Sequence, residues 1–403
     1  MNNIVIIGAG QAGARVAFSL RENGWDGNIT LIGEESYLPY ERPPLSKDFL
    51  TGEQSLESLY IATAEEYKTS KIDVLLNTKV VEIFTDLHQV KTDNNALISY
   101  SFLIFATGAQ ARQLELEKAN LVGIHTLRNV NDANLLNTAL TNAQHVAILG
   151  GGFIGLEVAA AARKLGIKTT LIEQNHSCLN RVLPSSAADP IIEYHKNNDV
   201  QIVCGKSILA INGHDKVESL VLDDYSIVSA DVVVVGIGSI PNDELAKKIG
   251  LDCPNGISVN SNCQTSVENI YAIGDVACHY DNDYSRLLRL ESWENAEEQA
   301  KKAAKHILSN FDHTNTASIP WFWTDQYNLN VQVLGKPTLG ILRATRADPS
   351  PYKSIQFYFQ EATLIGAVLF GNGKEKRTVS KLIGTQLDPQ ILSDSAISLK
   401  SLI

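Results

Sequence analysis

The sequence is poor in cysteine and has no cluster of metal-binding residues. Five cysteines occur in 403 residues, and nine histidines are scattered along the chain without an H-E-x-x-H motif. The cysteines are odd in number, widely spaced and free of any C-x-x-C pair: Cys178, Cys204, Cys253, Cys263 and Cys278. Such spacing predicts neither a disulfide framework nor a zinc or iron–sulfur site. We therefore do not expect a metalloenzyme.

The chain also lacks an excess of positive charge. It carries 34 basic and 45 acidic side chains, which give a formal net charge of −11 at pH 7. A nucleic-acid-binding protein should present a basic face, so this class is not expected. Small basic patches that bind a protein partner remain compatible with the acidic total.

Long hydrophobic runs are absent as well. No segment approaches the roughly 18 apolar residues of a membrane-spanning helix, and residues 1–8 lack the basic stretch of a secretion signal. We expect a cytoplasmic protein without a membrane anchor. Hydrophobic residues make up 44% and charged residues 20% of the chain, as in globular proteins. The length predicts two to four domains.

The clearest feature that is present is a glycine-rich pattern near the start of the chain. An apolar, β-branched run at residues 4–7 is followed by Gly8-Ala9-Gly10-Gln11-Ala12-Gly13 and by a helical pattern that ends near residue 24. A second apolar run at residues 29–32 leads to Glu34. This order of strand, G-x-G-x-x-G, helix, strand and acidic residue is typical of a dinucleotide-binding fold.

The same pattern returns in the middle of the chain. Residues 145–149 are an apolar run, Gly150-Gly151-Gly152-Phe153-Ile154-Gly155 form the loop, and a run at 169–172 ends at Glu173. In such loops the first glycine permits the turn, the second lets a pyrophosphate approach the backbone, and the third lets helix and strand pack closely. One isolated copy could be only a turn, but two copies in full context predict two nucleotide sites.

Other segments complete the predicted fold. Apolar runs at residues 102–106, 231–235 and 269–273 are interpreted as buried strands, and residues 294–308 as a helix. From residue 320 onward, aromatic and β-branched residues alternate with polar ones. We therefore predict an α/β protein with two Rossmann-like dinucleotide-binding domains and a C-terminal α+β domain.

Three further segments carry a resemblance to a known family: Pro39-Tyr40-Glu41-Arg42-Pro43-Pro44-Leu45-Ser46-Lys47, Glu291-Ser292-Trp293-Glu294-Asn295-Ala296 and Pro320-Trp321-Phe322-Trp323-Thr324-Asp325-Gln326. Together with Ala106-Thr107-Gly108 and Ile273-Gly274-Asp275, they resemble the two-dinucleotide-binding flavoproteins of glutathione-reductase topology. Over essentially its whole length the chain is similar to the NADH-dependent ferredoxin reductases of bacterial multicomponent oxygenases, together with putidaredoxin and rubredoxin reductases.

The resemblance implies that the first repeat binds FAD and the second binds NADH. It divides the chain into an FAD-binding domain of residues 1–110 and 240–318, an NAD-binding domain of 111–239 and a C-terminal domain of 319–403. The residues implied for FAD are Gly8, Gly10, Ala12, Gly13, Glu34, Arg42, Lys47, Val80, Arg128, Asp275 and Trp293. Those implied for NADH are Gly150, Gly152, Ile154, Gly155, Glu157, Glu173 and Gly238.

Some of these residues have a simpler structural interpretation. Glu34 is alternatively a solvated acid, Asp275 a helix N-cap, and Trp293 part of the core. Glu173 bears on the choice between NADH and NADPH, because a carboxylate at that place bonds a ribose diol and repels a 2′-phosphate. Residues 174–177 contain no arginine or lysine, so we expect NADH.

Lys47 and Glu157 are the predicted catalytic pair. The family resemblance implies that the lysine lies beside the flavin N5 and faces the glutamate. A cation there stabilises negative charge on the reduced flavin, and the opposite charge keeps the lysine in place. The alternative makes Lys47 an exposed residue after Ser46 and Glu157 a surface helix position.

The absence of cysteine near residues 39–50 bears on the electron acceptor. Disulfide reductases of this superfamily need a cysteine pair beside the flavin, and the related NADH oxidases and peroxidases need one cysteine. The family therefore implies single-electron transfer to a two-iron two-sulfur ferredoxin that serves an oxygenase. A rubredoxin reductase or NADH diaphorase and an apoptosis-inducing-factor-like flavoprotein are the alternatives. Arg286 and Arg289 are candidates for docking an acidic ferredoxin.

Overall fold

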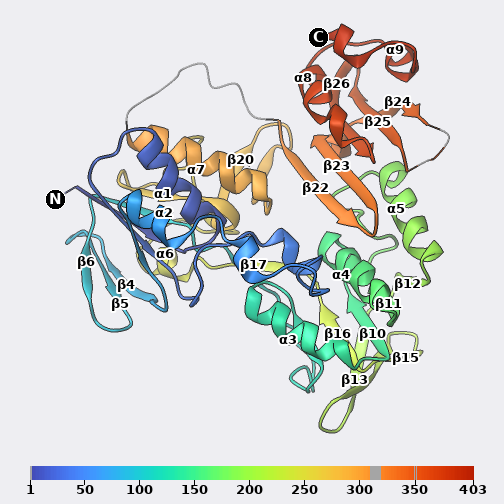
Figure 1. Ribbon diagram of the computed structural model, residues 1–403, viewed down its shortest axis with the longest axis horizontal. Coiled ribbons are helices and arrows are strands. Elements are labelled where there is room, and N and C mark those ends of the chain that lie inside the picture. The colour runs from blue at the N-terminus through green and yellow to red at the C-terminus, as the bar shows by residue number, and fades with distance from the viewer. Residues whose placement is uncertain (1, 309–318, 349, 351) are drawn as a thin grey trace. The chain divides into compact units, whose positions relative to one another are not determined.

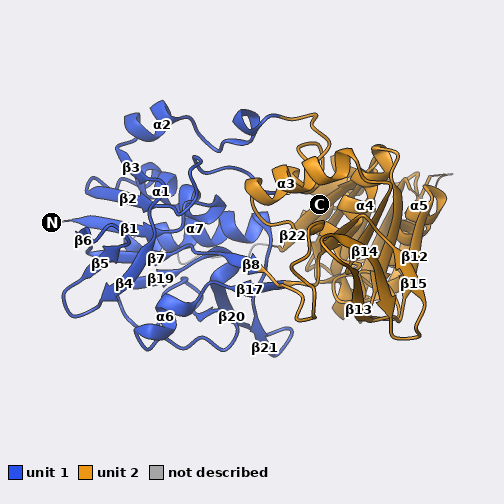
Figure 2. Ribbon diagram, turned by 90° about the horizontal axis from the view of Figure 1, so that it is seen from below, with its two compact units in different colours: residues 1–42, 55–110, 239–318 blue, residues 43–54, 111–238, 319–403 orange. Residues whose placement is uncertain are grey.

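The computed structural model describes residues 2–308, 319–348, 350 and 352–403. The contacts divide the chain into two compact units, which Figure 2 shows in different colours. Unit 1 consists of residues 1–42, 55–110 and 239–318, and unit 2 consists of residues 43–54, 111–238 and 319–403. The predicted three-domain division stays a prediction, and residues 309–318, at the end of its first domain, lie outside the described residues.

The centre of unit 1 is a five-stranded parallel sheet with the strand order β19-β7-β1-β2-β3 (Figure 2). Figure 1 shows the same chain coloured by residue number. Its strands are β1 (Asn3–Ile7), β2 (Asn28–Ile32), β3 (Ile72–Leu75), β7 (Phe102–Phe105) and β19 (Ile270–Ala272). Strands that are covered on both faces are apolar at nearly every position. The predicted strands at the start of the chain and before Thr107 are thereby confirmed.

Different elements cover the two faces of this sheet. Ile4 and Ile6 share a buried cluster with α1 (Gln11–Glu22) and α7 (Trp293–Ile307), which pack against each other. Val5 belongs to a cluster on the opposite face, because successive side chains of a strand alternate. That cluster includes residues of the antiparallel sheet β4 (Val80–Phe84), β5 (Gln89–Thr92) and β6 (Leu97–Ser99), and of α6 (Glu244–Lys248).

Unit 2 contains a second parallel sheet, with the strand order β12-β11-β10-β16-β9. Its strands are β9 (Ile124–Thr126), β10 (His145–Leu149), β11 (Lys168–Glu173), β12 (Val200–Cys204) and β16 (Val232–Val235). Strands β10, β11, β12 and β16 repeat the arrangement of β1, β2, β3 and β7, which confirms the predicted duplication. The fifth position differs, since β19 follows β7 in the chain whereas β9 precedes β10.

The remaining elements of unit 2 are three helices, a small antiparallel sheet and the C-terminal domain. The helices are α3 (Val130–Thr141), α4 (Phe153–Lys164) and α5 (Ser185–Asn197), and the small sheet is β13 (Ile208–Gly213), β14 (Val217–Leu222) and β15 (Ile227–Ser229). The C-terminal sheet has the order β22-β23-β26-β25-β24 and is antiparallel. Its strands and helices are β22 (Trp321–Gln326), β23 (Leu329–Gly335), β24 (Ile341–Ala347), β25 (Ser354–Gln360), β26 (Thr363–Phe370), α8 (Lys376–Leu382) and α9 (Pro389–Ser393). The predicted α+β domain is confirmed.

Residues 43–54 belong to unit 2, although unit 1 residues precede and follow them. Asn137 of α3 donates an Nδ2 hydrogen bond to the Leu50 carbonyl oxygen at 2.7 Å. Lys164 of α4 forms an ion pair with Glu53. The segment is therefore held between two helices that lie far away in the sequence.

Within unit 2, α5 is bonded to the C-terminal sheet. Ser186 Oγ lies 2.8 Å from the Tyr358 hydroxyl oxygen, and Gln356 Nε2 donates to the Ser186 carbonyl oxygen at 2.9 Å. His195 is fully buried, and its Nε2 lies 2.7 Å from Gln326 Oε1. Burial lowers the pKa of His195 from 6.5 to about 4, so the folded protein keeps this ring neutral at pH 7.

This lowered pKa predicts a loss of stability in weak acid. The unfolded chain binds a proton at His195 below pH 6.5, whereas the folded protein does so only near pH 4. The free energy of unfolding therefore falls as the pH drops through this window, by about 2 kcal/mol between pH 6.5 and 5. Urea unfolding at both pH values checks this, and His195→Gln should lose about 2 kcal/mol less than the wild type. Equal losses in both proteins contradict the assignment.

The structure also bears on membranes and metals. None of the helices in the described ranges is both long and apolar enough to cross a bilayer. Among these same residues, histidine, cysteine, aspartate and glutamate side chains do not gather into a group of three that could hold a metal ion.

Candidate functional site

Both glycine loops lie at the carboxyl end of the central strand of their sheet, β1 in unit 1 and β10 in unit 2. At these strands the order reverses, with β2 or β11 on one side and β7 or β16 on the other. Ligands bind at such a switch point in open α/β sheets. The duplicated topology therefore provides one candidate site in each unit.

The first and third glycines of each loop are required by the protein itself. Gly8 has a φ of 110° and Gly150 a φ of 103°, and a Cβ on either would overlap a main-chain oxygen at the end of the neighbouring strand. A Cβ on Gly13 would overlap the Gly8 oxygen, and a Cβ on Gly155 would overlap the Gly150 oxygen. These four glycines allow the turn and bring the helix close to the strand.

The second glycine of each loop is not required by close packing, because a Cβ there would not overlap any of the described residues. A Cβ on Gly152 would meet nothing within 4 Å, and a Cβ on Gly10 would meet only Arg42 Nη2, at 3.9 Å. Both glycines precede helices, α1 and α4, that have neither a side-chain cap nor an acidic residue in the first turn as far as the structure describes them. Open space in front of uncapped N–H groups fits the pyrophosphate of a dinucleotide.

Arg42 brings a fixed positive charge to the loop of unit 1. Its guanidinium forms an ion pair with Glu35 at 2.7 Å. Burial alone would lower the pKa of Arg42, but Tyr40, Glu35 and Asp275 together raise it above its ordinary value. The guanidinium therefore stays charged beside Gly10, where it suits a phosphate group.

Glu34 and Val80 lie together at the edge of the same site. Glu34 is 69% exposed and forms an ion pair with Lys79 at 2.9 Å. The amide of Thr78 donates to the Gly33 carbonyl oxygen at 2.9 Å, which places the start of β4, and hence Val80, beside the end of β2. The side chain of Val80 is buried, so only its main chain can face a ligand.

The segment after β19 approaches the first helix of unit 1. A Cβ on Gly274 would lie 2.9 Å from the Ala12 Cβ, and the Gly274 amide donates to Gln299 Oε1 at 2.7 Å. The structure thus places the residue before Asp275 at the N-terminus of α1. Trp293 is the first residue of α7, which begins after the cap Ser292.

The two arginines predicted to dock a ferredoxin differ in their surroundings. The side chain of Arg289 is only 8% exposed, forms an ion pair with Glu291 and donates to the Asp275 carbonyl oxygen at 3.0 Å. Arg286 is exposed. The charge of Arg289 is therefore paired inside unit 1, whereas Arg286 is open to solvent, and a docking role for either residue stays a prediction.

Glu173 closes the site of unit 2. Its Oε2 accepts the Gly151 N–H at 2.6 Å, and its Oε1 accepts the main-chain N–H of Asn175 at 2.7 Å. These bonds fix an anionic side chain against the glycine loop. Ile154 is 47% exposed at the first turn of α4, and a Cβ on Gly238 would meet nothing within 4 Å.

Lys47 and Glu157 form a buried ion pair, with Nζ and Oε1 3.0 Å apart. Their side chains are 15% and 6% exposed. Glu157 Oε2 accepts the Ser46 hydroxyl at 2.5 Å, and its Oε1 also accepts the Thr324 hydroxyl at 2.6 Å. Two segments from distant parts of the chain, residues 43–54 and β22, therefore converge on this carboxylate of α4.

Strand β22 lies against α4 beside this pair. The ring of Phe322 meets that of Phe153, the first residue of α4, with centroids 4.9 Å apart. Trp321 and Trp323 stack on each other. Arg128 lies elsewhere in unit 2, between β9 and α3, and its main-chain N–H donates to Asp132.

Sequence reasoning did not single out several residues that the structure brings to these sites. Ser46 and Thr324 bond Glu157, Asn175 bonds Glu173, and Glu35 bonds Arg42. Ser46 and Thr324 do lie within two of the segments that carried the family resemblance. The sequence alone does not distinguish Glu35 from its acidic neighbour Glu34.

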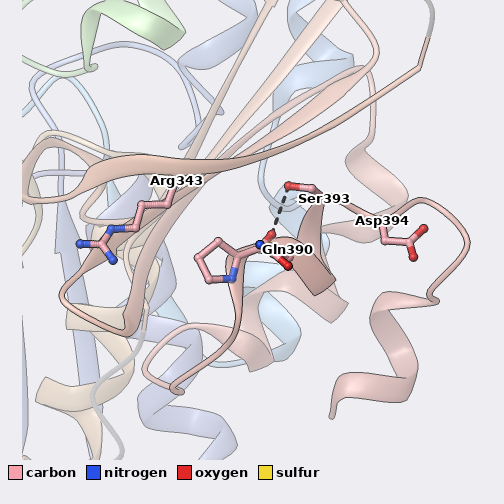
Figure 3. A pocket seen from close by; sticks show the side chains of 5 residues that line it. Arg343, Gln390, Ser393 and Asp394 are labelled. Atoms are coloured by element: carbon pink, nitrogen blue, oxygen red, sulfur yellow. Dashed lines mark hydrogen bonds between the residues drawn. The ribbon is translucent and has the colours of Figure 1, made fainter.

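None of the predicted site residues lines a surface pocket of about 380 Å³ in the C-terminal domain (Figure 3). It is lined by Arg343, Pro389, Gln390, Ser393 and Asp394 of the C-terminal domain. Ser393 Oγ donates to the Pro389 carbonyl oxygen within its wall, at 3.1 Å. Neither glycine loop contributes to it, so we do not treat it as the functional site.

The chain is similar to known proteins over nearly its whole length. Residues 2–300 match the family model described as pyridine nucleotide-disulphide oxidoreductase, and residues 321–403 match the one described as reductase C-terminal. The chain is similar to the anthranilate 1,2-dioxygenase system ferredoxin–NAD(+) reductase component of Burkholderia cepacia, with 37% identity over 402 residues. The match covers 99% of this chain and 98% of that protein.

A further relative and a solved structure also match the whole chain. Putidaredoxin reductase of Pseudomonas putida is 34% identical, over 100% of this chain and 97% of that protein. The crystal structure of a covalent putidaredoxin reductase–putidaredoxin complex has a TM-score of 0.93 and 33% identity, over 100% of this chain and 98% of that chain. The chain therefore belongs to the pyridine nucleotide-disulphide oxidoreductase family and, within it, to the ferredoxin–NAD(+) reductases, oxidoreductases that use FAD and NAD(H).

Proposed function

We propose that this protein takes a hydride from NADH and passes the two electrons, one at a time, to a two-iron two-sulfur ferredoxin that serves an oxygenase. The observation that carries the proposal is the pair of open second glycines, Gly10 and Gly152, each at the N-terminus of an uncapped helix. Two dinucleotides have room there, and the relatives of this chain include a ferredoxin–NAD(+) reductase component and a putidaredoxin reductase.

We assign the predicted site residues to two dinucleotides, FAD and NADH. We assign the loop from Gly8 to Gly13 to FAD, with Arg42 at its phosphates and Asp275 at the adjoining end of α1. Glu34, Val80, Arg128 and Trp293 are assigned to the rest of FAD. We assign Gly150, Gly152, Ile154, Gly155 and Gly238 to NADH. We propose the predicted domains, 1–110 with 240–318, 111–239 and 319–403, as the corresponding functional parts.

Lys47 and Glu157 are assigned to the reacting end of the cofactors. When bound, FAD supplies the chemistry, since it accepts two electrons together and releases them singly. Lys47 supplies a positive charge that Glu157, Ser46 and Thr324 hold in one place. The protein's task is therefore to orient the nicotinamide, to exclude water and to keep this charge fixed.

A ferredoxin is the proposed acceptor because the segment around Lys47 contains no cysteine. The first cysteine of the sequence is Cys178, so the segment around Lys47 holds neither the redox pair of a disulfide reductase nor the single cysteine of a peroxidase. The electrons must then leave to a separate protein. We place this activity in the cytoplasm, where NADH is regenerated.

Glu173 is proposed to select NADH over NADPH. Its carboxylate is fixed at the loop, where a 2′-phosphate would meet an anion. Replacing Glu173 with alanine and Asn175 with arginine should raise the kcat/KM for NADPH relative to NADH about tenfold or more. Steady-state kinetics with both nucleotides measure this ratio. Glu173→Gln, which keeps the acceptor oxygen but removes the charge, should fall in between, and an unchanged ratio in both variants would disprove the role.

The proposed function is tested by reconstitution. The chain is purified with FAD, mixed with NADH without oxygen and then given cytochrome c, with and without a two-iron two-sulfur ferredoxin. We expect a yellow protein that NADH bleaches and a cytochrome c reduction that depends on the ferredoxin. Equal reduction without the ferredoxin identifies a diaphorase instead, and a preference for added rubredoxin identifies a rubredoxin reductase. A colourless protein that does not oxidise NADH overturns the proposal.

A further inference from the structure

A row of buried polar side chains continues behind Glu157 within unit 2. Thr324 Oγ1 lies 2.6 Å from Glu157 Oε1, Gln326 Nε2 lies 3.1 Å from Thr324 Oγ1, and His195 Nε2 lies 2.7 Å from Gln326 Oε1. All four side chains are at most 6% exposed. Burying so many polar groups is costly unless each finds a partner, so the row needs an explanation.

The hydrogen bonds of this row all run in one direction. An ionised carboxylate only accepts, so the single hydroxyl proton of Thr324 goes to Glu157. The Thr324 oxygen then accepts from the Gln326 amide, whose own carbonyl oxygen faces His195. Gln326 Oε1 has no proton to give, so His195 must donate from Nε2.

The remaining ring nitrogen of His195 completes the order. His195 Nδ1 lies 3.4 Å from the Tyr327 hydroxyl oxygen. Burial lowers the pKa of His195 to about 4, so the ring carries one proton at pH 7, on Nε2. Every donor of the row is thereby turned toward Glu157, and hydrogen bonds arranged head to tail polarise one another.

We propose that Thr324, Gln326 and His195 are positioning residues that hold the Glu157 carboxylate aligned with Lys47. Thr324 and Gln326 are alternate residues of β22, so they share one face of that strand. His195 comes from α5, and Glu157 from α4. The C-terminal sheet thus supports the charge pair of the nucleotide-binding part. This inference rests on the proposed function only for the role of Lys47.

Kinetics of two Thr324 variants test the proposal. Thr324→Val keeps the shape of the side chain but removes the hydroxyl, whereas Thr324→Ser keeps the hydroxyl. We expect Thr324→Val to slow reduction of the bound FAD by NADH on the order of tenfold, with unchanged FAD content, and Thr324→Ser to retain most of the rate. A wild-type rate in Thr324→Val, or equal losses in both variants, overturns the positioning role.

A spectroscopic measurement keeps the test independent of activity. Nitrogen-15 labelling of histidine in the full-length holoprotein reports which ring nitrogen of His195 carries the proton, and His195→Gln identifies its signals. We expect the Nε2–H form in the wild type and in Thr324→Ser. Gln326→Leu, which removes the acceptor, should change these signals. An Nδ1–H form in the wild type overturns the proposal, even if NADH oxidation proceeds as expected.

The two tests also separate this inference from the proposed function. If the protein does not oxidise NADH at all, the proposed function fails, while the His195 signals still report whether the row is ordered as described. If NADH oxidation proceeds but Thr324→Val has no effect, only the positioning role fails.

Discussion

Replacing Lys47 with alanine is expected to slow reduction of the bound FAD by NADH about 100- to 1000-fold, the cost found for removing one preorganised group that stabilises charge at a reacting centre. Lys47 is 15% exposed and paired with Glu157 at 3.0 Å. In the variant, water that enters this largely buried place would not supply the stabilisation that the ammonium group provides. FAD content should stay unchanged, because the glycine loop that we assign to FAD lies in unit 1. Stopped-flow absorbance of the flavin measures the rate.

Two controls separate the charge of Lys47 from its contribution to stability. Removing one member of a buried ion pair leaves the other charge without a counterion, which is destabilising by several kcal/mol. The double variant Lys47→Ala/Glu157→Gln removes both charges, so it should regain stability but stay slow. Lys206→Ala removes an equally positive side chain from a solvent-accessible pair with Asp224 and should keep the wild-type rate. Rapid flavin reduction in Lys47→Ala would remove this residue from the mechanism.

Gly152→Ala is expected to raise the KM for NADH roughly 5- to 150-fold, the equivalent of about 1–3 kcal/mol for crowding a packed contact. The fold should tolerate the change, because a Cβ on Gly152 would meet nothing within 4 Å. The new methyl group would instead fill the space that we assign to the pyrophosphate. Steady-state kinetics give the KM, and the thermal transition shows that folding is preserved.

The other glycines of the loops provide matched controls. Gly10→Ala makes the same change in the first loop, so it should lower FAD content and leave the KM for NADH unaltered in the fraction that retains FAD. Gly155→Ala should fail to fold, since its Cβ would overlap the Gly150 oxygen. A normal KM in Gly152→Ala means that the open space in front of α4 is not where NADH binds.

Much of the fold is predictable from local patterns. The glycine loops are predictable because the turn at Gly8 and the close packing at Gly13 tolerate no Cβ, so glycine is required at both positions. The buried parallel strands are predictable because both of their faces are apolar. Helix α7 begins one residue earlier than predicted, at Trp293, because Ser292 caps it by accepting the Asn295 N–H at 3.2 Å.

The convergence at Glu157 is less predictable, because its partners come from distant segments. Ser46 is 111 residues and Thr324 is 167 residues away from it. No local pattern says that residues 43–54 leave unit 1 for unit 2. The same is true of Arg289, which looks like a surface charge in the sequence but points to the Asp275 carbonyl oxygen. The hydrogen-bond and ion-pair partners of these side chains depend on the tertiary fold.

The strand that fills the fifth position of each sheet sets the order in which the nascent chain can fold. Translation releases β9 before β10, β11, β12 and β16, so one continuous stretch ending at Val235 completes the sheet of unit 2. The sheet of unit 1 is completed only later in translation, because β7 ends at Phe105 but β19 begins only at Ile270. An uncovered strand edge is a template for pairing with other chains. The edge of β7 is therefore the place where a ribosome-bound intermediate needs protection from aggregation.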